Sequence, residues 1–193
     1  LVGMIRAMNM EAQHRKKDPV RLHRQLLESA AMIAGRDGIA ALSLNAVARE
    51  AGVSKGGLMH HFPNKQALIF ALFARLLAIM EKAISELMAA DNIAYGRYLR
   101  YLSNPELTDT HESRQLMVLS LAMPDEPVLR KCWRDWMLDH LAQGDALDNG
   151  PTGTLVRYAA DGIWLSELTE GRTMSSEHRQ ALVNDLTKMT LPA

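Results

Sequence analysis

The segment from Ser43 to Lys65, SLNAVAREAGVSKGGLMHHFPNK, concentrates side chains suited to binding a charged polymer. It holds hydroxyls that can cap helices, two lysines, two adjacent glycines and two adjacent histidines. Lysine donates strongly to phosphate oxygens, and glycine lets another surface approach the backbone. These residue types predict contacts to nucleic acid more readily than they predict catalysis.

Local signals in this segment predict two short helices joined by a glycine turn. Ser43 can cap the first helix, which is expected to end near Ala51, and Gly52 can supply the positive φ of the turn. Ser54 can cap the second helix, which should stop before Phe62. A helix-turn-helix places its second helix in the major groove. The candidate DNA-contacting residues of this unit are Ser43, Ser54, Lys55, Gly56, Gly57, Met59 and His60.

The charge distribution favours the same end of the chain. The 193 residues have a formal net charge of zero, with 22 basic and 22 acidic side chains. Residues 14–65 contain nine Lys and Arg against four acids, a balance of +5, which leaves 13 basic and 18 acidic residues elsewhere, a balance of −5. The basic part is therefore the one expected to meet phosphates.

Apolar residues recur every three or four positions along almost the whole chain, which predicts an all-α fold. The expected helices cover about 19–37, 43–51, 54–61, 64–89, 93–102, 111–122, 126–143, 152–170 and 176–189. We expect a disordered leader or arm over 1–18, a helix-turn-helix DNA-binding domain over 19–65, and a further helical domain over 66–193. The boundary falls inside a long helix, not in a flexible linker.

The N-terminal region resembles the TetR family of transcriptional repressors. The matching residues, in order and spacing, are Ala48, Ala51, Gly52, Val53, Ser54, Leu58, His61, Phe62 and Lys65. The resemblance implies that Lys65 and His61 or its neighbour contact phosphates, and that Phe62 lies in the core. Met59 departs from the pattern, because the family commonly has a phosphate-binding Tyr there. The segment from Ala159 to Leu165 also resembles the family's dimerisation domain.

The resemblance further implies that residues 66–193 form a helical ligand-sensing and dimerisation domain with a pocket for an effector. Aromatic and sulfur-containing residues are frequent beyond residue 90, which favours a small lipophilic or aromatic ligand. Asp161 is an acid within an apolar run, and it can pair either with a cationic ligand or with Arg157 one turn earlier. The candidate ligand-binding residues are Tyr98, Met117, Trp136, Asp161 and Trp164. For each of them an ordinary place in the core is the alternative.

The last two helices are expected to pair two copies of the chain, as the resemblance implies. Small or apolar residues three to four apart allow a second helix to approach closely. The candidate dimer-interface residues are Leu155, Ala159, Gly162, Ser166, Leu182 and Leu186. Packing within one subunit is the alternative. A two-fold dimer would bind palindromic operator DNA with its two recognition helices about one turn apart.

Other classes of function have less support in the sequence. Ser43–Lys65 could be a helical corner of an unrelated all-α protein, although adjacent helical glycines argue against it. The neighbouring His60 and His61 point about 100° apart on a helix, so no metal or cofactor is expected. Cys132 and His140 lack the third group of a nucleophilic site, and an enzyme using Asp161 or His140 has no recognisable motif.

We expect a cytoplasmic protein without membrane spans. The leading alternative is a DNA-binding regulator that senses no small molecule.

Overall fold

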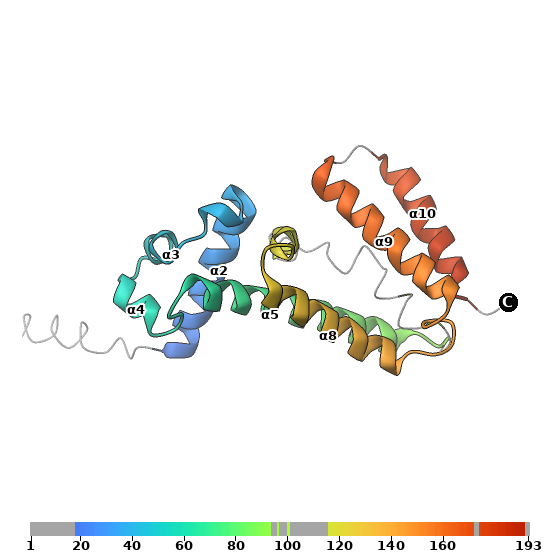
Figure 1. Cartoon of the computed structure of the whole chain (residues 1–193), viewed down its shortest axis with the longest axis horizontal. Coiled ribbons are helices and arrows are strands. Elements are labelled where there is room, and N and C mark those ends of the chain that lie inside the picture. The colour runs from blue at the N-terminus through green and yellow to red at the C-terminus, as the bar shows by residue number, and fades with distance from the viewer. Residues whose placement is uncertain (1–17, 94–95, 97–99, 101–115, 172–173, 192–193) are drawn as a thin grey trace, which may run out of the picture.

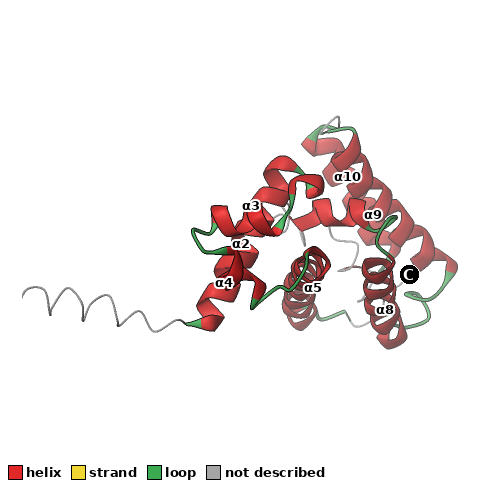
Figure 2. Cartoon of the chain, turned by 60° about the vertical axis from the view of Figure 1, so that its left-hand side comes forward, coloured by secondary structure: helices red, strands yellow, loops and turns green. Residues whose placement is uncertain are grey.

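The computed structural model describes residues 18–93, 96, 100, 116–171 and 174–191. Within these ranges all regular elements are helices, as predicted (Figure 1; Figure 2). They are α2 (Pro19–Asp37), η1 (Ile39–Ala41), α3 (Leu44–Glu50), α4 (Lys55–Met59), α5 (Lys65–Ala90), η3 (Val118–Ala122), α8 (Pro127–Gln143), α9 (Pro151–Thr169) and α10 (Ser176–Met189).

The N-terminal helices begin at polar side chains that satisfy the free N–H groups of the first turn. The Ser43 hydroxyl accepts from the Ala46 N–H at 3.1 Å, and the Asn64 side chain accepts from Ala67 at 2.8 Å. The Ser43 cap was predicted from the sequence. Asp18 also caps α2, accepting from Val20 and Arg21 at 3.1 Å, a cap that the sequence analysis missed.

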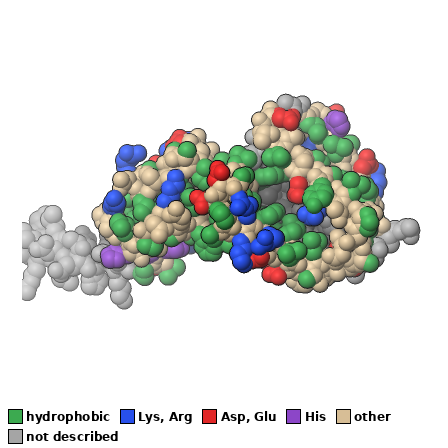
Figure 3. Space-filling model, in the orientation of Figure 1, with side chains coloured by type: hydrophobic (Ala, Val, Ile, Leu, Met, Phe, Trp, Pro, Cys, Tyr) green, Lys and Arg blue, Asp and Glu red, His purple; other side chains and the backbone are tan. Residues whose placement is uncertain are grey.

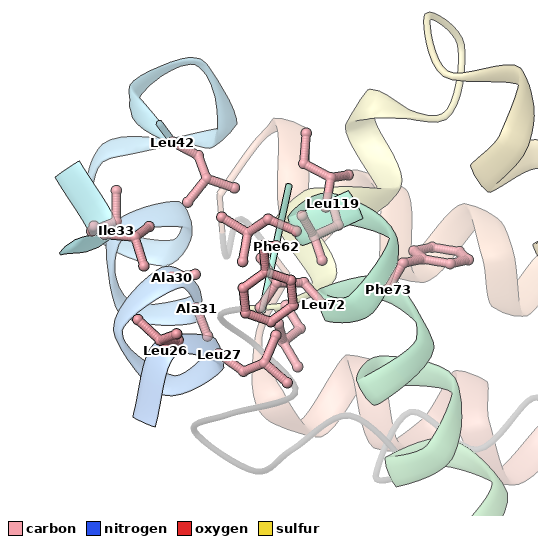
Figure 4. Close-up of a cluster of buried hydrophobic side chains, with 14 of the residues drawn as sticks. Leu26, Leu27, Ala30, Ala31, Ile33, Leu42, Phe62, Leu72, Phe73 and Leu119 are labelled. Atoms are coloured by element: carbon pink, nitrogen blue, oxygen red, sulfur yellow. The ribbon is translucent and has the colours of Figure 1, made fainter. Parts of the chain in front are cut away.

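A hydrophobic core holds α2, α3 and α4 against the first half of α5. Figure 4 shows Leu26 and Ile33 of α2, Phe62 of the loop before α5, and Leu72 of α5 converging on it. Leu26 and Leu72 are fully buried, and Phe62 is only 2% exposed, which places it in the core as the resemblance implies. The same cluster includes Leu119 of η3 and reaches α8.

The helices lie along an elongated molecule, with α3 and α4 at one end and α9 and α10 at the other (Figure 1). The long α5 runs from the first group towards the second, and α8 packs beside it. This arrangement separates the candidate DNA-contacting residues from the candidate dimer face.

Some predicted helices differ from those in the structure, and others lie outside the described residues. The end of the helix predicted over 111–122 is a 3-10 helix, η3, and residues 111–115 are not described. Most of the helix predicted over 93–102, and all but the last residue of the predicted leader, also lie outside the described residues. None of the described helices is long and apolar enough to cross a membrane.

Candidate functional site

The turn between α3 and α4 has the geometry of a helix-turn-helix corner. Gly52 has φ of +67°, a conformation that residues with a Cβ rarely adopt. The Val53 N–H donates to the Ala48 carbonyl at 2.9 Å and closes the turn. Gln25 of α2 donates to the Ala51 carbonyl at 2.9 Å, so the corner is also fixed to the preceding helix. These bonds hold α4 at a defined angle to α3.

One buried leucine sets the rotation of α4. Leu58 is fully buried, and helical spacing of 100° per residue places Gly56 and His60 about 160° away from it. Gly56 and His60 therefore form the outermost row of α4. Lys55 and Met59 lie on one side of this row, and Gly57 lies on the other. Lys55, Met59 and His60 are all exposed, so α4 presents them outward.

The two glycines of α4 differ in their surroundings. A Cβ on Gly56 would have no protein atom within 4 Å, whereas a Cβ on Gly57 would lie 3.3 Å from the Ser54 hydroxyl oxygen. That oxygen accepts the Gly57 N–H at 3.1 Å and caps α4 as predicted. Gly57 therefore has a reason within the fold to lack a side chain, and Gly56 has none among the described residues.

The basic side chains near this corner are partly held by the protein. Lys65 Nζ donates to the Ile39 carbonyl at 3.4 Å, and Arg36 pairs with Asp37 and Glu50. The Lys55 ammonium makes neither a hydrogen bond nor an ion pair with the described part of the chain. Figure 3 shows Lys, Arg and His side chains on the lobe that contains α2, α3 and α4.

His61 belongs to a cluster of rings beside this basic surface. Its ring centroid lies 5.6 Å from that of His23, whose ring lies 4.8 Å from Phe62. Burial, followed by the neighbouring His61, lowers the pKa of His23 below its ordinary value of 6.5. The imidazole of His23 is therefore favoured in its neutral form.

The candidate ligand residues occupy separate places. Trp164 of α9 donates its indole N–H to the Met117 sulfur at 3.4 Å, so these two are brought together. Trp136 of α8 instead lies at the contact between α8 and α5. Tyr98 is outside the described residues. No cluster of three or more His, Cys, Asp or Glu able to hold a metal ion occurs in the part of the chain that the structure describes.

A carboxylate that the sequence analysis missed organises the surroundings of Trp136. One oxygen of Glu81, in α5, accepts from the Trp136 indole at 3.1 Å and lies 3.0 Å from His140 Nε2. The other ring nitrogen of His140 donates to the Trp136 carbonyl at 2.9 Å, and Trp133 stacks on Trp136 with centroids 5.3 Å apart. Trp136 and Glu81 are 55 residues apart, so no helical periodicity could have paired them.

Asp161 lies on the flank of α9, with more than a third of its surface exposed in the single chain. Nearby protein atoms desolvate the carboxyl group and raise its pKa, and the opposing charge of Arg157 lowers it by less. Arg157 itself stacks over the Tyr158 ring, 4.5 Å from its centroid.

An apolar stripe on α9 is exposed to solvent in the single chain. Leu155 is 57% exposed, Tyr158 61% and Leu165 46%, and they lie on one side of the helix. A Cβ on Gly162, in the same stripe, would meet open space. Ala159 and Ser166 border the stripe, whereas Leu182 and Leu186 are partly buried on α10, which packs against α9.

Two family profiles match the chain. One, described as bacterial regulatory proteins of the tetR family, covers residues 26–72. The other, described as the tetracyclin repressor-like C-terminal domain, covers residues 95–191. The chain is also 24% identical to the HTH-type transcriptional regulator BetI of Vibrio parahaemolyticus serotype O3:K6, over 178 residues that cover 83% of this chain and 87% of the relative. BetI of Vibrio campbellii is 25% identical with the same coverage.

Solved structures share the fold. A transcriptional regulator from Rhodococcus sp. Rha1 matches with a TM-score of 0.70 and 20% identity, over 87% of this chain and 95% of that one. The multidrug binding protein EbrR complexed with malachite green matches with a TM-score of 0.66 and 21% identity, over 89% of this chain and 98% of that one. The similarity extends over both the helix-turn-helix and the C-terminal helices.

Proposed function

Because the chain belongs to the TetR family of transcriptional regulators, we propose that it is a repressor that binds palindromic operator DNA as a homodimer and is released by a small lipophilic or aromatic ligand. The family consists of DNA-binding regulators and not of enzymes. The observation that carries the proposal is the α3–turn–α4 corner, which presents Lys55, Met59 and His60 outward at one end of the molecule. Such a regulator acts in the cytoplasm, where its operator is.

The residues around this corner can position the protein on the DNA backbone. Ser43 and Ser54 accept backbone N–H groups through their oxygens, so each hydroxyl hydrogen remains available to a phosphate. Lys65 uses one N–H for the long bond to Ile39 and keeps two others. His61, half-buried beside His23, can add a further donor. Such contacts fix the position of the protein along the duplex, but by themselves they do not distinguish one DNA sequence from another.

The proposed dimer interface is the outward stripe of α9 together with α10. Pairing would bury the side chains of Leu155, Tyr158 and Leu165. Each Å² of apolar surface that is removed from water stabilises the dimer by about 25 cal/mol. The open space at Gly162 would let the same helix of a second copy approach closely. Two-fold pairing there would leave the α4 helices at opposite ends, able to contact two half-sites.

The proposed effector would bind between the C-terminal helices and stabilise a spacing of the DNA-binding ends that does not fit the operator. The Met117–Trp164 contact supplies an aromatic and polarisable wall. Asp161, one turn before Trp164 on α9, would favour a cationic ligand. EbrR, a structural relative, has been crystallised with malachite green, which makes that aromatic cation a reasonable first probe.

The proposal is tested by selecting genomic DNA fragments with the purified protein and then measuring duplex affinity at several salt concentrations. Affinity should fall steeply with salt, and Lys65→Ala should weaken all duplexes alike and reduce the salt slope by about one. Malachite green and neutral aromatic compounds are then titrated with and without operator. Loss of operator affinity with any of them supports release by ligand. No effect of any compound would favour a regulator without small-molecule sensing, and no duplex binding at any salt concentration would overturn the assignment.

A further inference from the structure

The side chains of α4 that can reach DNA lie on one flank of the helix. Lys55 and Met59 are four residues apart and therefore on the same side, next to the outermost row of Gly56 and His60. The opposite flank carries Gly57, which has no side chain. Within α4 itself, side-chain contacts to base edges must therefore come from Lys55 and Met59, whereas the exposed His60 follows the last residue of the helix.

The chemistry of these two side chains differs. The Lys55 ammonium has three N–H donors and no acceptor, and no described residue bonds to it. In the major groove, guanine presents two acceptors, O6 and N7, whereas the cytosine edge presents a donor. Lysine is therefore complementary to guanine.

Met59 offers neither a donor nor a charge, and it is 45% exposed in the free chain. An exposed thioether gains little from a phosphate but loses contact with water when it packs against an apolar group. The only apolar group on a base edge in the major groove is the thymine methyl. Met59 is therefore complementary to thymine.

The spacing of the two residues sets the spacing of the two bases. Four residues of helix rise about 6 Å at about 1.5 Å per residue. Successive base pairs are about 3.4 Å apart along the duplex. The two contacted base pairs are therefore about two steps apart if α4 lies along the groove.

We propose that Lys55 and Met59 determine the operator preference of this chain, by contacting a guanine and a thymine about two base pairs apart in each half-site. This inference rests on the proposed function, because it assumes that α4 enters the major groove. Gly56 and Gly57 add no side-chain contact, so α4 specifies few positions of the half-site.

Base analogues in one half-site of the selected operator test the assignment. Uracil in place of thymine removes only the methyl group, and 7-deazaguanine in place of guanine removes only the N7 acceptor. At one thymine, uracil should weaken binding of the wild-type dimer about fourfold, the effect of one buried methyl group. At a guanine two base pairs away, 7-deazaguanine should weaken it about tenfold.

The variants assign each effect to a residue. Met59→Ala should lose the sensitivity to uracil, and Met59→Leu should keep it because the apolar contact survives. Lys55→Ala should lose the sensitivity to 7-deazaguanine. Met32→Ala is the matched control, because Met32 is 42% exposed on α2 and should leave both sensitivities unchanged. Lys55 and Met59 are exposed, and circular dichroism should show folded variants.

The possible failures are distinguishable. The base assignment is overturned if Met59→Ala keeps the full sensitivity to uracil. It is also overturned if Lys55→Ala weakens all duplexes equally and keeps the sensitivity to 7-deazaguanine. In both cases the proposed function stands. A separation of more than three base pairs between the two sensitive positions also overturns it. If the wild-type protein binds no duplex, the proposed function is overturned and this assignment with it.

Discussion

Replacing Gly56 with alanine should stabilise the protein and at the same time weaken its binding to operator DNA. Glycine within a helix costs about 0.5–1 kcal/mol relative to alanine. The new Cβ would have no protein atom within 4 Å, so no strain offsets the gain. We expect the free energy of unfolding to rise by about 0.5–1 kcal/mol, and the Tm at fixed protein concentration by about 1–3 °C.

The same methyl group would point at the DNA. Gly56 lies in the outermost row of α4, opposite the buried Leu58, so its backbone is where the floor of the groove would approach most closely. Inserting a methyl group into a well-packed contact costs about 1–3 kcal/mol. Operator affinity should therefore fall about 5- to 150-fold.

Gly57→Ala is the matched control for this substitution. Its Cβ would lie 3.3 Å from the Ser54 hydroxyl oxygen, so it would press on the cap of α4 and lose much of the gain in stability. Urea denaturation and fluorescence anisotropy with a labelled operator give the two quantities separately. If Gly56→Ala binds operator as tightly as the wild type, no close approach occurs at Gly56. If Gly56→Ala is less stable than the wild type, the space next to Gly56 cannot hold a methyl group without strain.

Three further substitutions test other parts of the structure. Asn149→Ala should lower the free energy of unfolding by about 1–2 kcal/mol in urea denaturation, because the Asn149 amide donates to the carbonyls of Leu141 at 2.9 Å and Asp145 at 3.0 Å near the end of α8. Gly162→Leu should leave the chain folded but give monomers in sedimentation, and an unchanged dimer would place the interface elsewhere. The lowered pKa of His23 means that the unfolded chain binds more protons, so stability should fall as the pH decreases below about 6.5. His23→Gln should flatten that decrease, and an unaltered pH profile would show that His23 does not cause it.

Local chemistry explains why the DNA-binding end could be predicted so closely. Ser43, Ser54 and Asn64 each precede a helix and bond within three residues, so the sequence itself contains both partners of each cap. Gly52 adopts positive φ for a reason equally local to the turn. The cap at Asp18 is not predicted because Asp18 is the last residue of the segment 1–18 that is expected to form a leader or arm.

The C-terminal half depends on contacts between distant residues. The frequency of aromatic residues beyond residue 90 predicts Trp136 as a ligand contact together with Trp164 and Asp161. The structure instead bonds its indole to Glu81, a partner fixed by how α5 and α8 pack and by no sequence pattern. The Met117–Trp164 contact, 47 residues apart, was included among the candidates by residue type and not as a pair. Residue type therefore indicated participants, and helix packing decided their neighbours.

One hydrophobic core connects the DNA-binding helices to the region proposed for sensing. Leu72 and Phe73 of α5 belong to the same buried cluster as Leu119 of η3 and Leu129 of α8. Packing is therefore continuous across the boundary predicted after residue 65, and a division by role there remains a prediction. Packed side chains resist small continuous adjustments, so a ligand that displaces α8 must move α5 with it or break these contacts. Under the proposed function, this rigid connection lets a ligand with different affinities for two arrangements of α5 and α8 change the spacing of two α4 helices at a distance.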